Sequence, residues 1–265
     1  MSTFFEKIND LDILLHCDGY EREYFFAECS RLAYKGQKLA SKEFKKVGFT
    51  SYKFCSVEGA QCHIVKNRDY IVIAFRGTEP RQFSDIKADL MAWKRKSRTE
   101  GHVHAGFKNE LDKLWADIKM GLSRKGDRTI YLCGHSLGGA IATVCASRLE
   151  KDVEELYTYG SPRVGGDIFR DNLLVDHCRV VNNNDMVAKV PFWLMGYRHH
   201  GHLTYINHYG NIRELTSWQK LKDQIRGRWC ALRNFQMFDG IRDHDINKYC
   251  KKLKSLVKIE PTFGD

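Results

Sequence analysis

The chain has 265 residues, which allows one large domain or two small ones and a substantial buried core. It contains 43% hydrophobic and 29% charged residues, with 4 Pro and 21 Gly, and this composition excludes collagen and a Pro-rich disordered chain. No apolar run approaches the roughly 18 residues that would predict a membrane span. The nine cysteines include no Cys-x-x-Cys pair, so neither a zinc site nor a disulfide framework is expected.

The net charge of +10 is unevenly distributed, because residues 213–258 carry 12 basic and 5 acidic side chains. Such a stretch can meet nucleic acid, an anionic membrane or only solvent. No recognition motif accompanies it, so no nucleic-acid partner is expected. At the N-terminus, Glu6, Asp10 and Asp12 interrupt the apolar stretch that a secretory signal needs. We therefore expect a cytoplasmic location, with export that uses no N-terminal signal left open.

The first half of the chain predicts helices and strands in mixed order. Residues 20–34 place apolar side chains at helical spacing, and Gly36 is a plausible stop. Residues 44–57 and 62–65 resemble short strands. Residues 69–75 form a β-branched run that is typical of a strand buried on both faces. A helix over 107–122 follows a short extended piece.

The second half repeats a strand followed by a loop. Strands are predicted over 129–133, 156–159 and 178–181, with an apolar helix over 140–150. Strands alternating with helices indicate a parallel sheet, whose functional sites form at the carboxyl ends of the strands. Residues 197–209 alternate like a hairpin, and apolar spacing predicts a last helix from Ile246. With no flexible linker in view, we predict one domain over residues 1–265.

The most informative motif is G-x-S-x-G, which reads Gly134-His135-Ser136-Leu137-Gly138 in this chain. It lies directly after a predicted strand and directly before a predicted helix, where this turn lifts a serine clear of the sheet. The alternative is a phosphate-binding turn, but no Gly-Lys-Ser or Gly-Lys-Thr follows. Ser136 is therefore the candidate nucleophile.

A serine nucleophile needs a base and an acid. Where G-x-S-x-G lies between a strand and a helix of a parallel sheet, these residues follow the serine in the chain order Ser, Asp, His. Asp185 comes just after the strand over 178–181, at the correct end of the sheet; its alternative role is to cap a turn. Spacing alone leaves the base open among five histidines: His199, His200, His202, His208 and His244. The first four are one to six residues apart on an extended segment, a spacing that does not converge on a metal ion.

Several motifs together resemble the class 3 lipases, which are the fungal-type triacylglycerol lipases and their bacterial and plant relatives. The motifs occur in family order over about residues 25–255, and this resemblance implies the α/β-hydrolase fold with a mostly parallel central sheet flanked by helices. The motifs that carry the resemblance are residues 75–78 (FRGT), 104–107 (HAGF), 134–140 (GHSLGGA), 158–165 (TYGSPRVG), 184–187 (NDMV) with 190–191 (VP), 196–199 (GYRH), and 243–244 (DH) with Tyr249.

The resemblance also implies roles for individual residues. Ser136 matches the nucleophile, Asp185 the triad acid and His244 the base. The backbone N–H groups of Thr78 and Leu137 match the oxyanion hole, with Asp89 in the place of a carboxylate that orients the Thr78 hydroxyl. A triad of this kind requires no metal and no cofactor.

The implied activity is hydrolysis of lipid esters by a triacylglycerol lipase or esterase. Phospholipase A1 action on anionic membranes and a non-catalytic lipase-like interaction module are the alternatives. Residues 79–96 correspond to the family's lid but are more polar than an amphipathic lid helix, which argues against activation at an oil surface. Residues 217–238 combine an apolar helical face with basic side chains, and either pack on the sheet or face a membrane.

Overall fold

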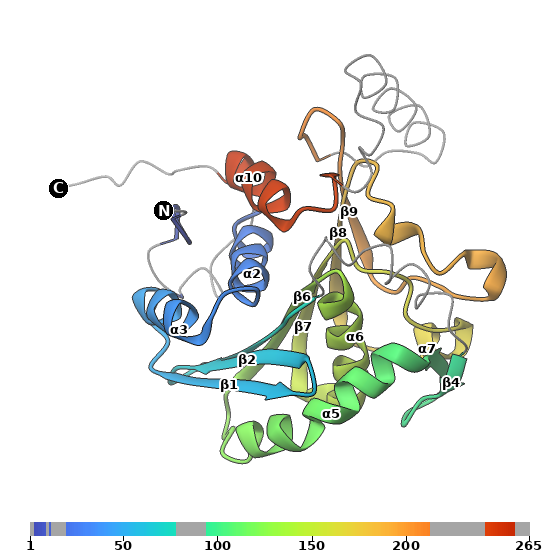
Figure 1. Cartoon of the computed structure of the whole chain (residues 1–265), viewed down its shortest axis with the longest axis horizontal. Helices are drawn as coiled ribbons and strands as arrows, with labels where there is room; N and C mark the ends of the chain where they lie inside the picture. Colours follow the sequence, from blue (N-terminus) through green and yellow to red (C-terminus); the bar gives the residue numbers. More distant parts are fainter. Residues whose placement is uncertain (1–2, 9–10, 12–19, 78–93, 213–241, 258–265) are drawn as a thin grey trace.

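The computed structural model describes residues 3–8, 11, 20–77, 94–212 and 242–257. A seven-stranded sheet in the order β1-β2-β3-β6-β7-β8-β9 forms its centre (Figure 1). An antiparallel pair of short strands, β4 (Lys94–Lys96) and β5 (His102–His104), lies apart from it. The strands of the main sheet are β1 (Ser51–Val57), β2 (Ala60–Lys66), β3 (Tyr70–Phe75), β6 (Thr129–His135), β7 (Val153–Tyr159), β8 (Asp176–Asn182) and β9 (His202–Ile206).

The sheet is mixed. The pairs β1–β2 and β2–β3 are antiparallel, whereas β3, β6, β7, β8 and β9 pair in parallel with their neighbours. These five strands therefore end at the same edge. The loops that follow them meet there, as expected for an open α/β sheet.

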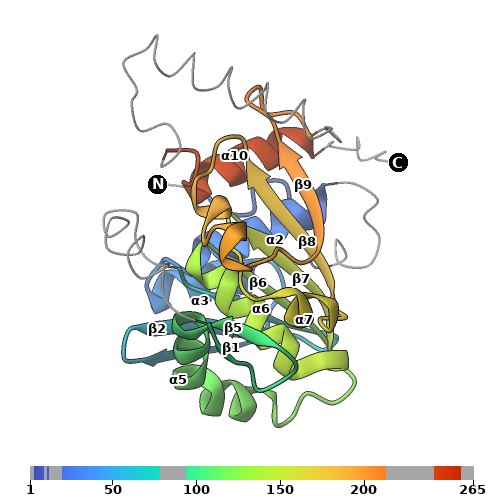
Figure 2. The same ribbon diagram turned by 90° about the vertical axis from the view of Figure 1, so that its right-hand side faces the viewer.

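Helices cover both faces of the sheet. On one face lie α2 (Glu21–Leu32), α3 (Gln37–Lys46) and α10 (Ile246–Leu256), and on the other lie α5 (Ala105–Leu122), α6 (Leu137–Leu149) and the short α7 (Asp167–Asp171). Figure 2 shows the same layers from the side of α7 and the β4–β5 pair. Short 3-10 turns complete the described part: Glu150–Asp152, Val187–Lys189 and Trp193–Met195.

The strand side chains alternate between two hydrophobic cores. On β6, Tyr131 and Cys133 pack in the core under α2, α3 and α10, whereas Ile130 and Leu132 pack in the core under α5 and α6. Because both faces are buried, β3 and β6 consist almost entirely of apolar residues. This accounts for the uninterrupted apolar run that predicted a doubly buried strand over 69–75.

Most predicted elements are confirmed within a few residues. The helices expected over 20–34, 107–122 and 140–150, and from Ile246, correspond to α2, α5, α6 and α10. The strands expected over 129–133, 156–159 and 178–181 correspond to β6, β7 and β8. The predicted parallel sheet with helices on its faces is also present.

Two predictions of local structure are wrong. Residues 44–57 are not all strand, because α3 extends to Lys46 and buries Ala40, Glu43 and Phe44, which lie on one face of the helix. Residues 197–209 are not a hairpin, because the segment contributes the single strand β9, which pairs in parallel with β8. β9 is the last strand of the sheet, and its final three residues, Thr204, Tyr205 and Ile206, are all buried.

The expectations for residues 79–93 of the lid-like segment and for the basic helix over 217–238 lie outside the described residues. At the end of the first of these segments, Lys94–Lys96 forms β4. Within the described part of the chain, no helix has the length and apolar character to cross a membrane.

We expect Phe26→Ala to lower the free energy of unfolding by about 3–5 kcal/mol, because it leaves a cavity in a closely packed core. The Phe26 side chain is fully buried, and its ring stacks on Tyr157 at 4.2 Å between centroids. Urea titration followed by circular dichroism measures the loss. Leu174→Ala, at a side chain that is 83% exposed, is the control and should stay within about 0.5 kcal/mol of wild type. A similar small loss for Phe26→Ala would contradict the packing described here.

Candidate active site

The turn between β6 and α6 carries Ser136 in a strained conformation. Its φ and ψ are 59° and −131°, a region that side chains other than glycine rarely adopt. The turn is held by the Ser136 N–H, which donates a 2.9 Å hydrogen bond to the carbonyl of Tyr159. A Cβ at Gly138 would lie 2.3 Å from the carbonyl oxygen of Phe75, so only glycine lets α6 begin this close to β3. The strain places the serine at the N-terminus of α6.

Three predicted side chains form one hydrogen-bonded chain. The Ser136 hydroxyl lies 2.7 Å from Nε2 of His244, and Nδ1 of His244 lies 2.8 Å from Oδ2 of Asp185. The three residues are 1%, 3% and 0% exposed, respectively. With Nδ1–H donated to the carboxylate, Nε2 is free to accept the serine proton. This is the arrangement of a serine nucleophile, a base and an orienting acid.

Asp185 accepts two further hydrogen bonds. Its Oδ1 receives the backbone N–H of Val187 at 2.8 Å, and its Oδ2 receives the Tyr249 hydroxyl at 2.5 Å. Burial and the neighbouring Asp185 charge raise the pKa of Tyr249, so the phenol remains a donor. A buried carboxylate needs such donors to stay ionised. Tyr249 comes from the second turn of α10, and His244 lies just before that helix.

The loop that carries His244 is fixed through the residue before it. Asn182 Nδ2 donates to the backbone carbonyl of Asp243 at 2.8 Å, and Asn183 Nδ2 donates to Oδ2 of Asp243 at 2.9 Å. The backbone N–H of Asn184 reaches the same carboxylate oxygen at 3.3 Å. The run of three asparagines before Asp185 therefore anchors the loop of His244 from a segment 59–61 residues earlier in the chain. The sequence displayed this run, but sequence reasoning assigned it no role.

His135 is a second buried histidine, behind the nucleophile. Its Nδ1 lies 2.8 Å from the Tyr34 hydroxyl, and its Nε2–H donates a 2.6 Å hydrogen bond to the backbone carbonyl of His244. Because a carbonyl only accepts, Nδ1 must accept from Tyr34. Burial, together with the proximity of His244, lowers the pKa of His135 and keeps it neutral. The sequence indicated His135 only as the variable residue of the G-x-S-x-G motif. It did not indicate that Tyr34 contacts this histidine.

Gly160 lets the triad lie against the end of β7. Its φ is +55°, and a Cβ at this position would lie 2.4 Å from Oδ2 of Asp185 and 2.8 Å from Nδ1 of His244. Any side chain here would enter the hydrogen bond between acid and base. This steric conflict explains why the motif at residues 158–165 has glycine at position 160.

Other predicted residues are placed as follows. Leu137 is the first residue of α6, directly after Ser136, whereas Thr78 and Asp89 lie outside the described residues. His199 and His200 contact the Ala188 carbonyl and His177, respectively, and His202 is exposed on β9. Of the histidines after Asp185, His244 is the one whose ring bonds the Ser136 hydroxyl. In the described part of the chain, no group of three His, Cys, Asp or Glu side chains could hold a metal ion.

Comparison with known proteins identifies a family that part of this chain resembles. The model of a family described as Lipase (class 3) matches residues 72–195. A secreted mono- and diacylglycerol lipase of Fusarium solani is 42% identical over 37% of this chain and 32% of its own length. Toxin TseL of Vibrio cholerae is 27% identical over 74% of this chain and 44% of its own length. The chain thus spans less than half of the length of each of these two relatives.

Solved structures share the fold. The triacylglyceride lipase of Rhizomucor miehei superposes with a TM-score of 0.60 at 23% identity, covering 69% of this chain and 78% of that one. A mutant form of MDLA from Penicillium cyclopium gives a TM-score of 0.60 at 21% identity, with 75% and 83% covered. The α/β-hydrolase fold expected from the sequence is confirmed.

The expected cytoplasmic location is wrong on this comparison. Relatives from Fusarium solani, Malassezia globosa and Penicillium cyclopium are secreted lipases, which points to an extracellular location. The expectation rested on three acidic residues near the N-terminus and on unpaired cysteines, and neither feature determines the compartment. The family match over residues 72–195, the shared fold and the order of the motifs together show that the chain is similar to the class 3 lipases.

Proposed function

We propose that this chain is a serine hydrolase of lipid carboxylic esters, acting as one lipase-like domain. The observation that carries the proposal is the continuous hydrogen-bonded chain from the Ser136 hydroxyl through His244 to Asp185. The family match and the names of the relatives, among them mono- and diacylglycerol lipases, support acylglycerols as the substrate class. The intact triad argues against a non-catalytic interaction module.

In the proposed reaction, Ser136 attacks the ester carbonyl while Nε2 of His244 takes its proton. Asp185 stabilises the resulting imidazolium. The tetrahedral oxyanion is held by the backbone N–H of Leu137 and, by resemblance, that of Thr78, whose hydroxyl Asp89 orients. His244 then protonates the leaving alcohol, which departs as the acyl-enzyme forms on Ser136. Water, activated by the same histidine, releases the fatty acid and restores the serine.

We further propose that the chain meets its substrate at an anionic lipid surface. Four apolar side chains follow Asp185 closely in the chain and are exposed: Phe192 by 51%, Trp193 by 60%, Leu194 by 78% and Met195 by 38%. Isolated exposed apolar residues are ordinary, but four in succession mark an interaction site. Aromatic and aliphatic side chains of this kind insert at the headgroup level of a bilayer.

Cations lie beside this apolar segment. The Lys94 ammonium donates a 2.9 Å hydrogen bond to the carbonyl of Gly196, which ties β4 to the end of the segment. Arg95 and Lys96 follow on β4 and are exposed, on the same side of the molecule as the segment (Figure 1). Each basic residue near an anionic leaflet contributes about 1 kcal/mol to binding. The charge therefore supports an anionic surface, and phospholipids as an additional substrate class.

Ser136→Ala should lower kcat by about 10⁴–10⁶ on p-nitrophenyl esters and abolish labelling by a fluorophosphonate probe, and His244→Ala should lower kcat by at least about 10³. Ser147→Ala and His202→Ala are the controls, because the Ser147 hydroxyl bonds the Val144 carbonyl within α6 and His202 is exposed on β9. Wild-type labelling of the Ser136 variant would disprove the assigned nucleophile.

Tyr249→Phe should lower kcat by about 10–100-fold with little change in KM, because it removes one hydrogen bond to a charged acceptor, Asp185. Steady-state kinetics on a soluble short-chain ester measure the effect. Tyr209→Phe removes a hydroxyl from a side chain that is 65% exposed and serves as the control. A Tyr249→Phe enzyme with unchanged kcat would show that the other donors to Asp185 suffice.

Arg95→Glu combined with Lys96→Glu should weaken binding to anionic vesicles at least about tenfold and spare hydrolysis of a soluble short-chain ester. Trp193→Ala should reduce binding to both anionic and zwitterionic vesicles. Co-sedimentation at two salt concentrations measures the binding. The matched control, Lys119→Glu with Arg124→Glu, reverses two exposed charges at the end of α5. Equal losses in the two double variants would assign the attraction to net charge rather than to this surface.

A further inference from the structure

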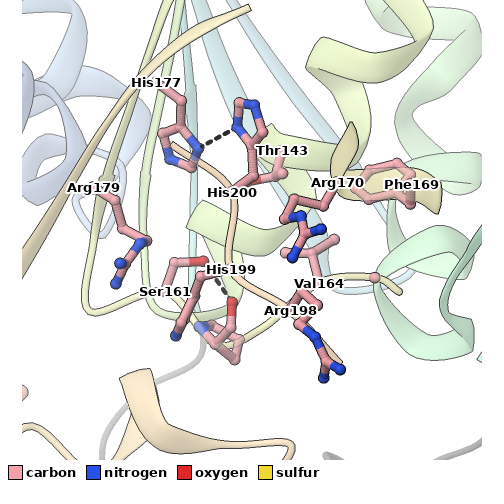
Figure 3. Close-up of a pocket in the computed structure, with 12 residues that line it drawn as sticks. Thr143, Ser161, Val164, Phe169, Arg170, His177, Arg179, Arg198, His199 and His200 are labelled. Atoms are coloured by element: carbon pink, nitrogen blue, oxygen red, sulfur yellow. Dashed lines mark hydrogen bonds between the residues drawn. The ribbon is translucent and has the colours of Figure 1, made fainter. Parts of the chain in front are cut away.

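A small cavity lies on the α6 side of the sheet, and its lining carries several cations (Figure 3). The side chains come from α6, the turn after β7, α7, β8 and the segment before β9. The cavity has about 10 Å³ in which the centre of a water molecule could lie. That space accepts a water or a monatomic ion but not a phosphate. The residues that matter to its charge are Arg170, Arg179, Arg198, His177, His199 and His200.

Arg179 is the central feature of this cavity, because no carboxylate among the described residues forms an ion pair with it. The Nε atom is buried and has no hydrogen-bond partner. Burial and the neighbouring Arg163 charge lower the pKa of Arg179 to about 10, which leaves the guanidinium protonated at pH 7. Arg179 is half-buried and its Nε is removed from water, so a neutralising partner would stabilise the guanidinium.

The two carboxylates of α7 are already occupied. Asp167 pairs with Arg170 at 3.1 Å and with Arg198 at 3.0 Å, and Asp171 pairs with Arg170 at 2.7 Å. Among the described residues, no carboxylate forms an ion pair with Arg179. The excess positive charge of the cavity is therefore located at Arg179.

The three histidines carry no negative charge, and their ring nitrogens already contact other groups. Thr158 lies 2.8 Å from Nε2 of His177, and Nδ1 of His177 lies 3.1 Å from Nδ1 of His200. His199 Nε2–H donates to the Ala188 carbonyl at 2.7 Å. Burial and the nearby cations lower the pKa of all three rings, so they are neutral. None of them can neutralise Arg179.

We propose that this cavity binds one monatomic anion of chloride's size beside the Arg179 guanidinium. The Ser161 hydroxyl, which makes only a long 3.2 Å hydrogen bond to the Pro162 carbonyl, lines the same space and can turn toward the anion. Size excludes phosphate and carboxylate ligands. The site is distinct from the catalytic triad and uses none of its residues.

The anion would stabilise the segment that follows the triad acid. Arg163 donates to the carbonyls of Lys189 and Pro191, and His199 donates to that of Ala188. These contacts hold the loop after Asp185 against a region in which Arg163 and Arg179 repel one another. An anion between these elements reduces the repulsion and stabilises the folded state by mass action.

Thermal unfolding in sodium bromide and in sodium gluconate at equal ionic strength tests the site, because gluconate is too large to enter. At about ten times the dissociation constant, bromide should raise the Tm by about 3 °C over gluconate, with saturation. Arg179→Met, which keeps the side-chain length but not the charge, should abolish that difference. Arg95→Met, at an exposed arginine of β4, should retain it.

Crystals of the wild-type protein grown in bromide give a test that depends on no variant. An anomalous peak beside the Arg179 guanidinium is expected. Water density without an anomalous signal, or equal Tm values in the two salts, would overturn the proposal. Neither measurement uses ester hydrolysis, so the outcome is separate from that of the proposed function.

Discussion

The hydrogen bonds between the turn after β8 and the loop before α10 are the constraint on which the candidate active site depends. His244 is 108 residues from Ser136 in the chain, and neither β6 nor α6 fixes its position. Asn182, Asn183 and Asn184 hold Asp243, and Asp185 holds the imidazole itself. One turn therefore orients the acid and the base together. Loss of that turn would leave a nucleophile without a partner.

The parallel sheet supplies the other half of the geometry. The ends of β6, β7 and β8 are in register, since His135 pairs with Tyr159 and Tyr159 pairs with Val180. The strained serine after β6 and the carboxylate after β8 thus flank Gly160, where the chain has no side chain to separate them. The buried triad then lies among fixed dipoles rather than water, which strengthens each of its hydrogen bonds.

Sequence reasoning succeeded where the chemistry is local. The strand, turn and helix around Ser136 lie within 21 residues, and their apolar pattern and glycines indicate each element. It was weaker where the site depends on contacts between distant segments. Spacing alone did not separate His244 from the four histidines in residues 199–208, and only the ordered family motifs did so. The roles of Tyr34 and Asn183 depend on partners more than 50 residues away, which no local pattern reveals.

The packing of α10 against α2 has a consequence for the biogenesis of the protein. These helices lie more than 200 residues apart in the chain and share one hydrophobic core. His244 and Tyr249 belong to the later segment, so the polypeptide emerging from a ribosome carries Ser136 and Asp185 long before it carries a base. A nascent chain that lacks α10 and the loop before it also lacks the ring that bonds the Ser136 hydroxyl. Packing of α10 against α2 thereby couples assembly of the candidate active site to the completion of folding.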